Sequence, residues 1–351
     1  MLVYILMIII SCFGGFLADK VVTKHSKLIA FMIAFVPVFL VSAVRFDVGR
    51  DYMDTYVYTF NKVLLDANDI RMDLGFLYLN KIIAFFGASY QWIFVISSFI
   101  INFFICKVIF EKSNNKFLSL FIYICGTLFF FSLNGIRQTM ALALFYYSLK
   151  YIEKQNIKKY FFINIVGALF HASAILFLPL YFILSKKLSV KLKLFLILIM
   201  IFILPISINI IHNLLLTTKY SMYITNGAYN PLDAINVSTI INILLFVVYE
   251  YIYQTKKIQD KQFNIYNNIH FLGIIISLFI TQISLAMRVF MYFRYIEFLS
   301  VPYLLSKMTT SKKNYKILMI IICALYFVYF IHGVYFENGN DVLPYQSILF
   351  R

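Results

Sequence analysis

The stretch that decides the fold is LIAFMIAFVPVFLVSAVRFDVGRDYMDTY, residues 28–56, in which an apolar run is followed at once by a dense cluster of charges. Residues 28–44 carry no charged side chain and approach the ~20 residues that a helix needs to cross a bilayer. In so apolar a chain, the cluster that follows is the first candidate for a functional site. It consists of Arg45, Asp47, Arg50, Asp51 and Asp54.

The composition of the whole chain is that of a membrane protein. Hydrophobic residues make up 62% of its 351 residues, charged residues only 13%, and the mean hydropathy is +0.85, far from the averages of soluble globular proteins. We therefore predict an all-α, polytopic integral membrane protein with about 10–11 transmembrane helices, forming a single membrane domain over residues 1–351. The apolar runs that supply these helices are 1–18, 28–44, 90–110, 116–133, 138–152, 160–184, 191–211, 236–253, 268–287, 289–306 and 315–335.

The net charge of +16 indicates membrane topology rather than a nucleic acid partner. The lysines gather in short connections between apolar runs, not on one basic face with interleaved aromatic residues. By the positive-inside rule these connections are cytoplasmic. The amino terminus and the loop 45–89, which balances acids against bases, are then extracytoplasmic. The lysine-rich connections are 20–27, 107–116, 150–159, 186–193, 256–261 and 307–316.

Further segments are expected on the same outer face. They are the turns 134–138 and 217–236, a turn near Arg288 and the tail from Glu337 onward. Residues 74–86 are expected there as an amphipathic helix on the surface or as a short dip into the membrane.

One apolar segment breaks the alternation of sides. Residues 160–184 have a lysine-rich connection at both ends, yet they are too short to cross the bilayer twice. A re-entrant hairpin with its break near His171 reconciles the count, because a broken helix in a membrane needs protein or water around it and GALFHASA, residues 167–174, holds polar side chains in mid-segment. The alternative is one straight span that departs from the positive-inside rule.

The sequence favours neither a metal site nor a cofactor. The four cysteines lie within apolar runs at no metal-ligand spacing, so we predict small core residues without disulfides. Neither a Gly-rich phosphate loop nor a serine-hydrolase elbow occurs. Asp47, Asp51 and Asp54 could hold a metal at low affinity, but the chemistry expected below does not require one.

Arginines at the outer ends of the spans are not explained by topology. An arginine presents a planar fork that pairs phosphate oxygens in bidentate fashion, so several on one face indicate an anionic ligand such as a lipid-linked diphosphate. The alternative is that they pair with nearby acids, Arg45 with Asp47 or Arg294 with Glu297. The arginines are Arg45, Arg50, Arg137, Arg288 and Arg294.

His171 is open to two interpretations. A lone histidine in an apolar neighbourhood can be a packing residue, but a polar group at a helix break in the membrane is costly unless it is paired. Near neutral pH, a histidine can also accept the proton of an attacking hydroxyl.

Six short motifs are spread over almost the whole chain. Arg45, Val48, Gly49, Asp51, Tyr52 and Tyr56 form the pattern R-x-x-V-G-x-D-Y-x-x-x-Y. The others are an acidic-x-G-F step at 73–76, N-G-I-R-Q at 134–138, F-H-x-S at 170–173, R-x-x-x-Y-F at 288–293 and P-Y at 344–345. In these motifs and their order the sequence resembles the EpsG-like family of Wzy-type bacterial polysaccharide polymerases. The chain departs from the family at Arg50, where a small residue is more usual, and at Asp73, which replaces a glutamate and shortens the reach of that carboxylate.

The resemblance implies an enzyme of the bacterial cytoplasmic (inner) membrane that joins oligosaccharide repeat units carried on undecaprenyl diphosphate, at the outer leaflet, during capsule or exopolysaccharide assembly. Its partners would be the lipid-linked oligosaccharide, membrane lipids and a chain-length regulator. A lipid-linked oligosaccharide flippase is the alternative, although charges gathered on one side favour an enzyme over a transporter with a cavity across the bilayer. A glycan ligase is a third reading, which the sequence does not separate from a polymerase.

On this hypothesis the arginines bind the diphosphate and one residue accepts the proton. Arg137 and Arg288 are the main diphosphate ligands, with Arg45 and Arg50 as supporting cations, and Asp51 or His171 is the general base. The supporting residues are Asp47, Tyr52, Tyr56, Asp73, Asn134, Gln138 and Arg294.

Overall fold

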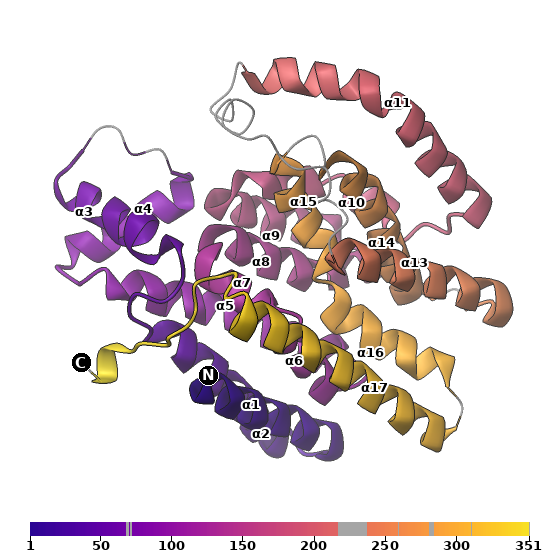
Figure 1. Cartoon of the computed structure of the whole chain (residues 1–351), viewed down its shortest axis with the longest axis horizontal. Helices are drawn as coiled ribbons and strands as arrows, with labels where there is room; N and C mark the ends of the chain where they lie inside the picture. Colours follow the sequence, from indigo (N-terminus) through magenta and orange to yellow (C-terminus); the bar gives the residue numbers. More distant parts are fainter. Residues whose placement is uncertain are drawn as a thin grey trace. The chain divides into compact units, whose positions relative to one another are not determined.

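The computed structural model describes residues 1–67, 70, 72–216, 237–258, 260–280, 284–309 and 311–350 (Figure 1). Within these ranges the chain is helical and has no β-strand, apart from an isolated antiparallel bridge between Arg45 and Ser347. The prediction of an all-α polytopic membrane protein is therefore confirmed.

The helices form two compact units, Met1–Leu178 together with Glu297–Arg351, and Pro179–Ile296. The single membrane domain over residues 1–351 stays a prediction. The first unit contains α1 (Leu2–Lys20), α2 (Lys24–Ala43), η1 (Tyr52–Val57), α3 (Tyr58–Leu64), α4 (Leu74–Phe85), α5 (Gln91–Lys112), α6 (Lys116–Cys125), α7 (Leu128–Asn134), α8 (Ile136–Glu153), α9 (Ile157–Phe170), η2 (Ala172–Phe177), α16 (Glu297–Met308), α17 (Lys312–Phe330), η4 (Ile331–Phe336) and η5 (Ile348–Phe350).

Six described helices are long and apolar enough to cross a membrane, or seven if the bent pair α6 and α7 forms one span. This number is smaller than the 10–11 predicted because some apolar runs divide into shorter helices. The run 116–133 bends by 46° between α6 and α7, where Thr127 adopts a left-handed conformation. The run 160–184 is interrupted at His171, where α9 has ended. Hydropathy averaged along the sequence does not register such breaks.

The amino-terminal helices show what lipid exposure does to the surface. α1 turns large apolar side chains such as Leu6, Ile9 and Phe13 outward, which a soluble protein would bury but which acyl chains solvate. Inside, polar side chains link helices: Asn102 on α5 donates to Ser42 Oγ on α2 at 3.1 Å and accepts from the Tyr123 hydroxyl on α6 at 2.8 Å. Such hydrogen bonds hold membrane helices together where no hydrophobic effect does.

The second unit is built from α10 (Leu180–Ile183), α11 (Val190–Leu216), α13 (Val237–Lys256), α14 (Lys261–Ile280) and α15 (Ser284–Arg294). Its interior holds an ion pair between Lys193 Nζ on α11 and Glu250 Oε1 on α13, at 2.6 Å, and Asn267 on α14 donates to the same oxygen at 2.9 Å. These hydrogen bonds offset part of the cost of removing the two charges from water. The predicted outer turn 217–236 lies outside the described residues.

The four cysteines are free, and Cys12, Cys106 and Cys125 are buried among apolar side chains, as predicted. Residues 74–86 are confirmed as helical, since α4 covers all but the last of them.

Candidate functional site

Three residues from distant motifs meet in the first unit. The Asp73 carboxylate lies 2.9 Å from Arg137 Nη1, and the same oxygen, Oδ2, lies 3.6 Å from His171 Nδ1. The side chains of Asp73, Arg137 and His171 are 10%, 24% and 14% exposed, so the group is mostly enclosed but reaches the surface. We call Asp73, Arg137 and His171 the acid–arginine–histidine cluster.

The first turn of α4 brings Asp73 to the cluster. Asp73 is the residue before α4, and its side chain forms no capping hydrogen bond with that helix. Its carboxylate reaches Arg137 instead. Gly75 lies so close to α9 that a Cβ atom on it would stand 2.9 Å from the Leu169 carbonyl oxygen. Only glycine permits this approach. Phe76 is fully buried and packs on Tyr56 with ring centroids 5.7 Å apart. The acidic-x-G-F motif therefore lets α4 pack closely against α9, which brings the Asp73 carboxylate to the cluster.

Arg137 is held by the junction between α7 and α8. The hydroxyl of Tyr56 donates to the carbonyl oxygen of Asn134 at 2.5 Å and accepts from the backbone N–H of Ile136 at 3.0 Å. Burial raises the pKa of Tyr56 to about 12, so the hydroxyl keeps the proton that it donates. This tyrosine satisfies two backbone groups at the helix break and fixes the turn from which Arg137 projects.

His171 marks the reversal of the chain after α9. Its backbone is extended, with φ −152°, and a 3-10 helix, η2, follows. The Tyr160 hydroxyl, near the start of α9, donates to the Phe177 carbonyl oxygen at 2.7 Å. Seventeen residues of continuous helix would put these positions about 25 Å apart. The break and the reversal at His171 are thus confirmed, and its placement in the membrane stays a prediction.

Arg45 lies in the protein interior, at the start of the loop that leads from α2 to η1. Its side chain is enclosed, Nη1 donates to the Val48 carbonyl oxygen at 2.6 Å, and the guanidinium lies 4.9 Å from the Phe94 ring centroid and 5.5 Å from that of Tyr52. Aromatic faces stabilise a cation in this way. Asp47, the predicted alternative partner, is exposed.

Gly49 and Tyr52 complete the fold of this loop. Gly49 has φ +100°, and a Cβ there would lie 2.7 Å from Asn134 Oδ1, so the R-x-x-V-G spacing serves a turn that an L side chain would not fit. Tyr52 is buried against Phe94, with the rings stacked 4.1 Å apart, and its hydroxyl donates to Gln91 Oε1 at 2.9 Å.

The carboxyl-terminal tail lies over this loop. Arg50 Nε pairs with Asp341 Oδ2 at 2.9 Å, and the Asn134 side-chain amide donates to the Asn340 carbonyl oxygen at 2.9 Å. The pairing with Asp341 raises the pKa of Arg50. Three segments predicted to share the outer face, 45–56, 134–138 and the tail, are therefore together. The contribution of Asp341 and Asn340 was not predicted, because no local pattern links them to the loop.

The other predicted site residues are placed as follows. Asp51 immediately precedes η1 and is half-buried, Asp54 is exposed, and Gln138 is buried on α8. In the described part of the chain, no three His, Cys, Asp or Glu side chains are placed to share a metal ion.

Arg288 and Arg294 belong to α15 of the second unit. Arg294 is buried, with its guanidinium 4.5 Å from the Tyr295 ring. Glu297, its predicted alternative partner, begins a new helix and accepts a hydrogen bond from the Tyr326 hydroxyl at 2.6 Å. The convergence of all five arginines on one ligand stays a prediction.

Comparison with known protein families agrees with the order of the motifs. A family model described as the EpsG family matches residues 28–347, which is most of the chain and includes every residue of the acid–arginine–histidine cluster. The chain belongs to the EpsG family. Neither a curated protein nor a solved structure matches it. The EpsG family is associated with polysaccharide biosynthesis, and its member described here is a multi-pass membrane protein.

Proposed function

We propose that this EpsG-family protein is an oligosaccharide repeat-unit polymerase. It transfers a glycan from undecaprenyl diphosphate to a sugar hydroxyl of a second lipid-linked unit, at the outer face of the bacterial cytoplasmic membrane, in capsular or exopolysaccharide biosynthesis. The observation that carries this proposal is the meeting of Arg137 and His171 on one carboxylate oxygen of Asp73. It combines a diphosphate ligand, a proton acceptor and the group that orients both.

In the proposed reaction, His171 is the general base. Asp73 Oδ2 faces Nδ1. When substrate binds, the carboxylate accepts a hydrogen bond from Nδ1–H, so that Nε2 presents a lone pair to the acceptor hydroxyl. The hydroxyl oxygen attacks the anomeric carbon of the donor glycan, its proton passes to Nε2, and the bond from the anomeric carbon to the diphosphate oxygen breaks. The 3.6 Å separation suits a free site, because catalytic hydrogen bonds often shorten only when substrate binds.

Arg137 stabilises the leaving group in this scheme. One guanidinium nitrogen is engaged by Asp73, and an arginine has five N–H donors, so others remain for the diphosphate oxygens. Donors fixed in advance where negative charge develops are typically worth about 10²–10³ in rate. Asp73 therefore has two roles, since it orients the base and fixes the arginine fork.

The remaining predicted site residues take supporting roles. Arg45 is enclosed and bonded to backbone and rings, so we assign it to loop positioning. Tyr52 and Tyr56 are likewise assigned to positioning, because the hydroxyl of each donates a hydrogen bond to a backbone carbonyl oxygen. Arg50 is exposed and pairs with Asp341 through Nε, and we assign its other N–H groups to a supporting role toward the diphosphate. Between the two predicted bases, the geometry favours His171 over Asp51, because His171 faces a carboxylate that can orient it.

The test replaces Arg137 in cells that make the cognate polysaccharide. Arg137→Ala should abolish long polymer while the protein remains folded in the membrane, and Arg137→Lys, which keeps the charge but loses the fork, should leave short chains. His171→Ala should also abolish polymer. Wild-type chain lengths in Arg137→Ala, with normal protein abundance, would refute the assignment.

A further inference from the structure

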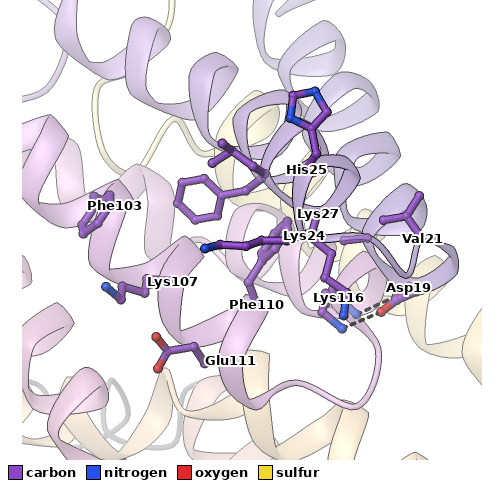
Figure 2. Close-up of a pocket in the computed structure, with 13 residues that line it drawn as sticks. Asp19, Val21, Lys24, His25, Lys27, Phe103, Lys107, Phe110, Glu111 and Lys116 are labelled. Atoms are coloured by element: carbon purple, nitrogen blue, oxygen red, sulfur yellow. Dashed lines mark hydrogen bonds and ion pairs between the residues drawn. The ribbon is translucent and has the colours of Figure 1, made fainter.

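A second site lies in the first unit, among helices that carry two of the lysine-rich connections. A cavity of about 940 Å³ opens between the ends of α1, α2, α5 and α6 (Figure 2). Its lining carries four lysines, Lys24, Lys27, Lys107 and Lys116, which come from two connections distant in sequence. The charge pattern predicts that these connections share the cytoplasmic side. This cavity is therefore distinct from the acid–arginine–histidine cluster, which is expected on the outer side.

The acids of the cavity do not neutralise its lysines. Asp19 is engaged by Lys116, with Nζ 3.0 Å from Oδ1, as Figure 2 shows. Glu111 pairs instead with Lys150, at 2.7 Å. Within the part of the chain that the structure describes, Lys24, Lys27 and Lys107 have no carboxylate within ion-pair distance. Three cations are therefore available to an anion.

The rest of the wall is apolar and aromatic. Phe31 of α2 packs edge to face on Phe103 and Phe110 of α5, with centroids 6.1 and 5.2 Å apart, and all three line the cavity. Leu28 adds an exposed aliphatic surface beside Lys27. A small hydrated anion would gain nothing from these rings, whereas an acyl chain would cover them. The lining is thus complementary to a single ligand with an anionic head and an apolar body.

We propose that this cavity is a binding site for an anionic glycerophospholipid. Lys24, Lys27 and Lys107 hold the phosphate, and the acyl chains run along Leu28 and the phenylalanine rings. The lysines are placed on two helices, α2 and α5, so an occupied site would hold these helices together at this end. The inference is independent of the polymerase reaction and concerns a different end of the unit from the acid–arginine–histidine cluster.

The test measures lipid preference in the purified full chain. Native mass spectrometry compares retention of palmitoyl-oleoyl phosphatidylglycerol with that of the zwitterionic phosphatidylcholine of the same chains. Each basic residue near an anionic lipid surface contributes roughly a fivefold gain in affinity. We expect phosphatidylglycerol to be preferred at least about tenfold, and the triple variant Lys24→Gln, Lys27→Gln, Lys107→Gln to lose that preference.

A matched control removes the same charge elsewhere. Lys154→Gln, Lys158→Gln, Lys313→Gln changes three exposed lysines that do not line the cavity, and it should keep the preference within about twofold. Equal retention of the two lipids by wild-type protein, or equal loss in both triple variants, would overturn the proposal. Displacement of phosphatidylglycerol by inorganic phosphate would identify a free-anion site instead and would also overturn it.

A measurement on unaltered protein covers the case in which the triple variant does not fold. A phosphatidylglycerol with a photoactivatable group on its acyl chain should crosslink within residues 24–31 or 103–110. Crosslinks confined to the outward apolar face of α1 would contradict the site.

Discussion

Replacing Asp73 by asparagine separates the catalytic contribution of the cluster from its structural one. The substitution keeps the size of the side chain but removes the charge that pairs with Arg137 and faces His171. Loss of a carboxylate that orients a catalytic histidine lowers the rate by on the order of 10²–10⁴-fold. We expect the rate of polymer formation to fall within this range.

The effect on stability should be much smaller. Asp73 does not cap α4, and the amide can still accept a hydrogen bond from Arg137, so the free energy of unfolding should fall by about 1 kcal/mol. A near-complete loss of activity with a nearly unchanged thermal midpoint is therefore the signature of the proposed role.

The assay compares purified variants with a single lipid-linked oligosaccharide as donor and acceptor, and follows chain length by gel. Asp73→Glu is the rescue variant because glutamate is usual in the family and keeps the charge, and it should retain most of the activity. Asp54→Asn is the matched control, since Asp54 is an exposed aspartate of the same loop. Wild-type activity in Asp73→Asn, or equal losses in Asp73→Asn and Asp54→Asn, would refute the reasoning.

Three further substitutions test the parts that position the cluster. Gly75→Val forces a side chain into the Leu169 backbone, so it should displace α4, lower stability by about 1–3 kcal/mol and abolish polymer; an unchanged melting temperature would contradict this. Tyr56→Phe leaves two backbone groups at the α7–α8 junction without their partner, and thermal unfolding should show a loss of about 1–3 kcal/mol, with lower activity. Arg50→Gln removes an exposed ion pair and should change the free energy of unfolding by less than about 1 kcal/mol; a larger loss would show that the tail depends on this pair.

Much of the fold followed from composition and charge. The apolar runs gave the all-α membrane class, and the grouping of loops 45–56 and 134–138 with the tail followed from the alternation of lysine-rich connections. The reversal at His171 was also predictable, because lysine-rich connections on both sides of one apolar run require a return. The number of spans was not, since hydropathy does not register a helix break such as that at Thr127.

The centre of the site was harder to predict. Asp73 and Arg137 are 64 residues apart, and ion pairs between helices leave no local pattern, so the sequence around Arg137 does not indicate its partner. The available signal was Gly75 beside Asp73, because a glycine in the first turn of a helix indicates close backbone approach. Arg45 illustrates the converse case: an arginine in a charged loop suggested a ligand, yet its nearest acceptor is a backbone carbonyl three residues on.

The most direct test of the central claim is the reaction itself. Purified wild-type protein in detergent is incubated with its cognate undecaprenyl diphosphate oligosaccharide, without nucleotide sugar and with excess chelator, and the products are resolved by size. The account predicts a ladder of repeat units together with release of undecaprenyl diphosphate, and no ladder with Arg137→Ala. Absence of a ladder from wild-type protein that instead moves the substrate across reconstituted vesicles would contradict it.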